Sequence, residues 1–109
     1  MNKINLKWSQ PIYNGSGAKA INFDASKYNE FHIYFLYGST AFSMIIPKDC
    51  AGTSAFGDVN PDFGLNRDSN SYARFLFGIT GNTGYLEPKQ MVVNGSNVLS
   101  SSWLQIRGK

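Results

Sequence analysis

The sequence has little cysteine, histidine or charge. Its 109 residues include one cysteine, Cys50, and one histidine, His32, which excludes an internal disulfide and a zinc site built from cysteine and histidine. Charged residues make up only 16% of the chain, against about 25% in an average soluble protein. No apolar run reaches the ~20 residues of a membrane-spanning helix, and residues 1–6 lack the apolar stretch of a signal peptide. We therefore expect a domain that folds in a cytoplasm and does not insert into a membrane.

Aromatic residues, in contrast, are frequent, at 15% of the chain. Disordered proteins have few aromatic residues and many charges, so the composition predicts a folded protein, and its length predicts a single domain over residues 1–109. Ten Lys and Arg residues against seven Asp and Glu give a net charge of +3. These basic residues are scattered and form no stripe that would neutralise phosphates, so we do not expect a nucleic-acid partner.

Hydrophobic and polar residues alternate along most of the chain, with the two-residue period of half-buried β-strands. In the clearest segment, residues 31–37, apolar residues occupy both faces, which predicts a central strand covered on both sides. A turn and renewed alternation up to Ile46 predict a hairpin. Further strands are predicted over residues 4–8, 21–23, 72–79, 85–86, 90–93 and 103–107. Seven or eight short strands without a helix predict an all-β antiparallel β-sandwich of jelly-roll-like form, with Phe35 and Phe75 in its core.

Two Asn-Gly dipeptides are each followed by serine, at residues 14–16 and 94–96. Both match the acceptor pattern for N-glycosylation. Because no signal peptide is visible, we interpret both as turns, and the second as the type I′ turn of a hairpin.

No arrangement of residues predicts catalysis or a cofactor. His32 lies within a predicted strand and Cys50 follows a turn and a proline, so the two are not expected to form a nucleophilic pair. No serine occupies a G-x-S-x-G motif, and nothing marks Glu30 and Glu87 as an acid–base pair. We predict no enzymatic activity and no cofactor.

Residues 48–70 interrupt the alternation, because glycine, proline, aspartate and asparagine separate isolated hydrophobic residues. A loop of more than about 15 residues in a small domain is often functional, so we predict that this segment contacts the partner. The predicted binding residues are the apolar anchors Phe56 and Phe63 and the polar rim Asp58, Asp62 and Arg67. In the alternative interpretation, both phenylalanines fold back and close one end of the sandwich.

Within this segment, Asp58, Asn60 and Asp62 alternate like the first ligands of a calcium loop. They do not begin an EF-hand, because Phe63 stands where that loop needs glycine and Ser69 stands where it needs a bidentate glutamate. A calcium loop of another kind stays open beside a surface loop rich in Asx turns. Our prediction is that the chain has no metal site.

Several features follow one another in a recognisable order. They are Trp8, the Gly/Ser-rich stretch 14–17, the segment 26–30 before the aromatic strand, Ile46-Pro47, Arg74 and the ending 103–109. In this order and spacing the sequence resembles the C-terminal module of tail-fibre and minor structural proteins of phages and prophages of Gram-positive and gut bacteria. Residues 105–109, Gln-Ile-Arg-Gly-Lys, are similar to the I-x-G-I-K-like phrase that ends many of those modules. The resemblance implies a β-rich virion domain without enzymatic activity that contacts the host surface or neighbouring virion subunits.

From this resemblance we expect a structural or host-attachment domain of a virion, of tail-fibre or head-decoration type, made in the cytoplasm of the bacterial host. Its partners would be virion subunits or a glycan or protein of the host cell surface, and it would form a homo-oligomer. Two alternatives stay open: a small phage-encoded inhibitor or adaptor that binds a host protein, and a free-standing carbohydrate-binding module. Oligomeric state separates them, because a virion component forms trimers or larger assemblies whereas the alternatives are more often monomeric.

Overall fold

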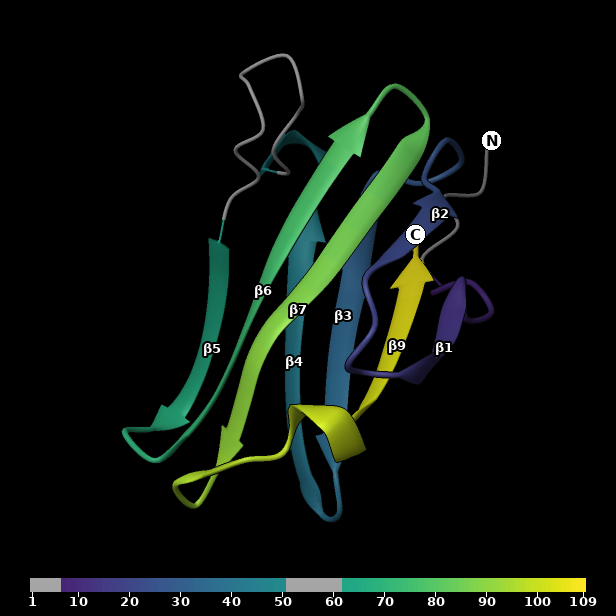
Figure 1. Ribbon diagram of the computed structural model, residues 1–109. Helices are drawn as coiled ribbons and strands as arrows, with labels where there is room; N and C mark the ends of the chain where they lie inside the picture. Colours follow the sequence, from purple (N-terminus) through teal and green to yellow (C-terminus); the bar gives the residue numbers. More distant parts are fainter. Residues whose placement is uncertain (1–6, 51–61) are drawn as a thin grey trace.

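The computed structural model describes residues 7–50 and 62–109. These residues form two antiparallel β-sheets that lie face to face, and the described part of the chain contains no α-helix (Figure 1). Alternate side chains of each strand point between the sheets, which is the two-residue period seen in the sequence. The predicted all-β antiparallel sandwich is confirmed.

The first sheet has four strands in the order β1-β9-β3-β4. Their bounds are β1 Tyr13–Ser16, β3 Glu30–Tyr37, β4 Thr40–Pro47 and β9 Trp103–Gly108. The hairpin predicted for β3 and β4 is confirmed, and its turn contains Gly38 at a φ of 57°, a conformation that favours glycine. A 3₁₀ turn, η1 (Lys48–Cys50), follows β4.

The second sheet has the order β2-β7-β6-β5, with the two-residue strand β8 paired to β7. Its strands are β2 Ile21–Asp24, β5 Asp62–Asp68, β6 Ser71–Thr80, β7 Thr83–Val93 and β8 Ser96–Asn97. Between β7 and β8, Asn94 and Gly95 have φ angles of 51° and 83°, which confirms the predicted type I′ turn. A 3₁₀ turn, η3 (Leu99–Ser101), leads into β9.

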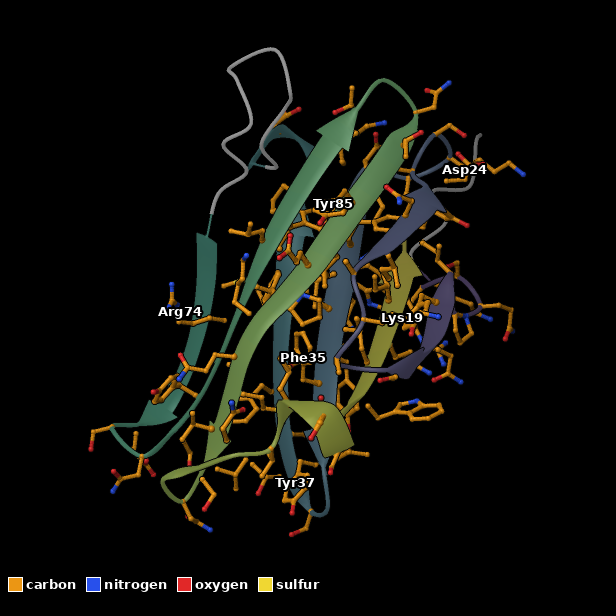
Figure 2. The ribbon with its side chains drawn as sticks, in the orientation of Figure 1. Lys19, Asp24, Phe35, Tyr37, Arg74 and Tyr85 are labelled. Carbon is orange, nitrogen blue, oxygen red and sulfur yellow. The ribbon has the colours of Figure 1, made fainter. Side chains whose placement is uncertain are left out.

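Phenylalanine side chains from both sheets meet in the core. Phe35 and Phe75 are 1% and 0% exposed, which confirms their predicted burial, and their ring centroids lie 5.7 Å apart. Phe31 and Phe77 make a similar contact at 5.5 Å. Figure 2 shows Phe35 between the two sheets. These tilted rings bury large apolar areas in favourable aromatic geometry, so they hold the sheets together.

Strand β7 is continuous where the sequence predicted two separate strands, over residues 85–86 and 90–93. Pro88 lies at a bulge, because the pairing with β6 steps from Arg74↔Gln90 to Phe75↔Pro88. A proline has no N–H for the ladder, and strands accept it at bulges. The bulge thus allows a strand to run through a residue that sequence patterns treat as a strand end.

The predicted loop over residues 48–70 is wrong in its second half, where Asp62–Asp68 forms β5 and pairs with β6. Phe63 stands opposite Phe75 and Leu65 opposite Ala73, and these two residues of β6 are buried. The glycine, asparagine and aspartates of β5 favour loops locally, but strand propensity depends strongly on the neighbouring strand. The partner strand β6 therefore determines the structure here.

Residues 14–16 also form a strand, β1, where the sequence predicted a turn. They pair with β9, and the backbone bonds from Ile12 N to Ile106 O and from Ser9 N to Gly108 O, both 2.7 Å, extend that pairing. The strand predicted over residues 4–8 falls mostly outside the described residues, and its last two residues are not in a strand. The edge of β9 needs hydrogen-bond partners, and residues 9–16 provide them.

Candidate binding surface

The outward side of the four-stranded sheet carries aromatic and amide side chains. Phe31, Ile33 and Phe35 of β3 are buried, whereas the residues between them are half-buried. The second side of this strand, which the sequence predicted to be covered, is therefore only partly covered. Across the sheet, His32 pairs with Arg107 and Ile45, Tyr34 with Gln105 and Ser43, and Leu36 with Trp103 and Ala41. We call this surface the outer sheet face and define it by Trp8, His32, Tyr34, Leu36, Ile45, Trp103, Gln105 and Arg107.

Trp103 is held in place although it is exposed. Its side chain is 48% exposed, and its indole Nε1–H donates a hydrogen bond of 2.5 Å to Oδ1 of Asn14. The pairing of β1 with β9 creates this contact, because Asn14 stands opposite Gln105, which is two residues from Trp103 along β9. A side chain that is already fixed loses less conformational entropy when a ligand binds. Trp103 is therefore a preorganised aromatic contact.

Ile45 is the second exposed large hydrophobic side chain among the described residues, at 53% exposure. It lies opposite His32 on β4, which is an edge strand of the sheet. Single exposed hydrophobic side chains are common on protein surfaces. Here Ile45 adds apolar area at the far side of a surface that already contains Trp103.

Two cationic side chains, Arg107 and Lys109, lie near Trp8 and Ser9 at one corner of the outer sheet face. The ring of Trp8 lies against His32, with 5.6 Å between centroids, and the amino group of Lys109 lies 5.2 Å from the Trp8 ring centroid, in cation–π geometry. Arg107 donates from Nη1 to the carbonyl oxygen of Ser9 at 3.1 Å. Two cations thus flank the aromatic side chains at this corner.

The surroundings of His32 favour the neutral form of its imidazole. Burial against its neighbours lowers the pKa of the imidazole, and the nearby guanidinium of Arg107 lowers this pKa further. Both effects penalise the charged ring. At neutral pH, His32 therefore offers one N–H donor and one nitrogen acceptor to the outer sheet face.

The predicted binding residues lie elsewhere. Phe56 and Asp58 fall outside the described residues, and Asp62, Phe63 and Arg67 belong to β5 of the second sheet, where the structure describes only their backbone. Their role in binding stays a prediction. Trp103 and Ile45 are not among the predicted binding residues. Each is a large hydrophobic residue at an outward-facing position of a strand whose alternate residues are buried.

Residues 7–50 and 62–109 form neither a cluster of metal ligands nor a membrane-spanning helix. This part of the chain brings together no group of three or more His, Cys, Asp or Glu side chains that could hold a metal ion. It also forms no helix with the length and apolar character needed to cross a bilayer. The calcium-loop motif at Asp58–Asp62 lies largely outside the described residues.

Comparisons with protein-family models, curated proteins and solved structures gave no significant match. The candidate function therefore follows from the chemistry of the outer sheet face.

Proposed function

We propose that this chain is a non-enzymatic structural or host-attachment domain of a phage virion, and that it binds a host-surface glycan through the outer sheet face. The observation that carries the binding proposal is Trp103, which is half exposed and hydrogen-bonded to Asn14. The β-sandwich fold supports the virion proposal, because the tail-fibre modules that the sequence resembles are expected to be β-rich.

The residues around Trp103 fit the chemistry of sugar recognition. An aromatic ring offers a flat apolar surface to the C–H face of a pyranose, and polar groups at its edge bind the hydroxyls. Gln105 lies two residues along the strand from Trp103, a distance of roughly 7 Å, and Tyr34 stands opposite Gln105. An indole, a phenol and an amide thus lie near one another on the same face of the sheet.

Weak binding at one such surface suits a protein that acts in many copies. A single exposed tryptophan buries limited area, so the affinity of one domain for one glycan is expected to be low. Multivalent attachment raises the overall affinity by 10²–10⁴-fold without a new contact. The proposal therefore includes self-association of the chain, which light scattering on the purified protein measures. A strictly monomeric protein would instead favour the inhibitor, adaptor or free-standing carbohydrate-binding alternatives.

The binding test combines glycan-array screening with isothermal titration calorimetry on the full chain. Trp103→Ala is expected to weaken binding at least tenfold, a loss of about 1.4 kcal/mol. Asn14→Ala keeps the indole but removes the acceptor that fixes it, so we expect a smaller loss of several fold.

The control variant is Tyr85→Ala, which removes a half-buried aromatic side chain from the second sheet and should leave glycan binding unchanged. Equal affinity of Trp103→Ala and the unmodified chain would contradict the assigned surface. Absence of any glycan ligand, together with binding of a single host protein, would support the inhibitor or adaptor alternative.

A further inference from the structure

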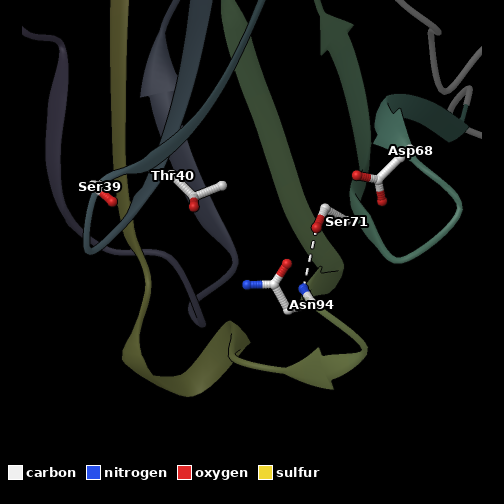
Figure 3. Close-up of a pocket in the computed structure, with 5 residues that line it drawn as sticks. All are labelled: Ser39, Thr40, Asp68, Ser71 and Asn94. Carbon is white, nitrogen blue, oxygen red and sulfur yellow. Dashed lines mark hydrogen bonds between the residues drawn. The ribbon is translucent and has the colours of Figure 1, made fainter.

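A polar pocket opens at the end of the sandwich where three turns meet. It has a volume of about 330 Å³. Its lining residues lie at these turns: Ser39 in the β3–β4 turn and Thr40 at the start of β4, Asp68 and Ser71 on either side of the β5–β6 turn, and Asn94 in the β7–β8 turn (Figure 3). One wall thus comes from the first sheet and the other from the second. The volume lies at the lower end of the range for small-molecule sites.

Hydrogen bonds fix the wall that the second sheet supplies. The backbone N–H of Asn94 donates to Oγ of Ser71 at 3.1 Å, and Gly95 N–H donates to the carbonyl oxygen of Asn70 at 2.8 Å. These bonds join the β7–β8 turn to the β5–β6 turn. Asp68 closes its own turn by accepting the N–H of Asn70 on Oδ1 at 2.8 Å. The positions of Asp68 and Asn94 are therefore set before any ligand arrives.

Several polar atoms around the pocket make no hydrogen bond to the part of the chain that the structure describes. Within the described residues, Oδ2 of Asp68, the side-chain amide of Asn94 and the hydroxyls of Ser39 and Thr40 have no hydrogen-bond partner. Figure 3 shows the Asp68 carboxylate and the Asn94 amide directed into the space between the turns. The pocket thus holds a carboxylate, an amide and hydroxyls that are ready to bind an outside molecule.

The lining determines the class of that molecule. The five lining residues include no cation and one carboxylate, which disfavours an anion, and they include no aromatic or aliphatic side chain that would attract an apolar ligand. An ammonium group can use only acceptors, whereas the Asn94 amide and the hydroxyls also donate. Groups that both donate and accept are satisfied together by vicinal hydroxyls. We propose that this pocket binds one neutral pyranose unit through its hydroxyl groups.

The pocket and the outer sheet face are distinct places on the sandwich, so this inference does not depend on the proposed function. Its probes are glucose, galactose, mannose and N-acetylglucosamine, each titrated separately into the isotope-labelled full chain and followed by NMR chemical shifts. At least one sugar should shift the amide signals of residues 39–40, 68–71 and 94–95. The variant Trp103→Ala, which alters only the outer sheet face, should leave these shifts unchanged.

The sharpest variant is Asp68→Asn. Asparagine keeps the Oδ1 acceptor that closes the turn with Asn70 and replaces the Oδ2 acceptor with a donor, so sugar affinity should fall at least tenfold while the melting temperature stays close to that of the unmodified chain. The matched control is Asp24→Asn. Asp24 accepts the N–H of Ser26 in the same kind of turn at 3.0 Å, and Figure 2 places it at the opposite end of the sandwich from Tyr37.

A second variant, Asn94→Gly, removes the amide and keeps the turn, because glycine readily adopts the φ of 51° found here. It should also abolish the sugar-dependent shifts. Calcium chloride and methylammonium chloride test the two cationic ligands that a lone carboxylate could attract. The proposal is overturned if none of the sugars shifts these signals, if only a cation does, or if Asp68→Asn binds sugar as tightly as Asp24→Asn.

Discussion

Phe23 of β2 stands opposite Gly84 of β7, and its ring occupies the space that a Cβ atom at position 84 would need. The same ring stacks on Phe77 at a centroid distance of 5.9 Å. A side chain at position 84 would therefore displace a core aromatic ring and not merely fill a gap.

We expect Gly84→Ala to reduce the free energy of unfolding by about 1–3 kcal/mol, the usual effect of overpacking a core. Urea denaturation of the variant measures this change. Thr83→Ala is the control, because Thr83 is the exposed neighbour on the same strand, and a change there should stay within about 0.5 kcal/mol. Equal stability of the two variants would mean that the ring of Phe23 moves aside without loss.

The contact between Phe35 and Phe75 predicts a large and coupled effect of truncation. Each Phe→Ala change should lower the free energy of unfolding by about 3–5 kcal/mol, because both rings are buried in the core. Since the rings touch across the sandwich, the double variant should differ from the sum of the single variants by roughly 0.5–1.5 kcal/mol. A loss below roughly 1 kcal/mol for either single variant would contradict the assigned packing.

Lowering the pH should destabilise the protein through His32. Its pKa in the folded chain lies below the ordinary value of 6.5, so the unfolded chain binds a proton first and its free energy falls relative to that of the folded chain as the pH falls. The stability linked to His32 is fully present above pH 6.5 and is lost as the pH falls from 6.5 through the folded pKa. Melting temperatures between pH 7.5 and 5 should fall less in His32→Gln than in the unmodified chain, whereas parallel curves would show that His32 takes no part.

Glu87 should control the ionisation of Tyr85. The phenol donates a hydrogen bond of 2.6 Å to Oε1 of Glu87, and Lys89 donates to Oε2 at 2.7 Å. The bond to this carboxylate is the main reason that the pKa of Tyr85 is raised. In Glu87→Gln the pKa of Tyr85 should fall toward 10.0, as NMR titration of the labelled tyrosine ring measures. Lys89→Ala is the control, since it keeps the carboxylate, and an unchanged pKa in Glu87→Gln would rule out the contact in solution.

Strands with strong internal alternation could be predicted from the sequence. The segment 31–37 reveals β3 by pattern alone, although apolar residues at both phases do not show which face is buried. Asn94-Gly95 reveals a type I′ turn because few other residues tolerate positive φ at both positions. Strands β1 and β5 could not be found in this way. Their residues favour turns locally, and each becomes a strand through pairing with the edge of another strand: β1 pairs with β9 at the other end of the chain, and β5 pairs with β6, which directly follows it.

The candidate sites were harder to predict for a related reason. Trp103 and Asn14 are 89 residues apart, and no local pattern indicates that they form a hydrogen bond. Likewise, the sequence gives no sign that Ser39, Asp68 and Asn94 converge on one pocket. Alternation tells which face of a strand a residue occupies, whereas the neighbours on that face depend on the order of strands in the sheet.

The position of β9 between β1 and β3 also constrains when the protein can fold during synthesis. Residues 103–108 are translated after the other strands of both sheets, yet they occupy an interior place in the first sheet and bring Leu104 and Ile106 to the core. Until they leave the ribosome, β1 has no partner and one edge of β3 stays open to other chains. A nascent chain that stalls before Trp103 would thus expose unpaired strands, so completion of the first sheet waits for residues 103–108 and depends on contacts between distant parts of the chain.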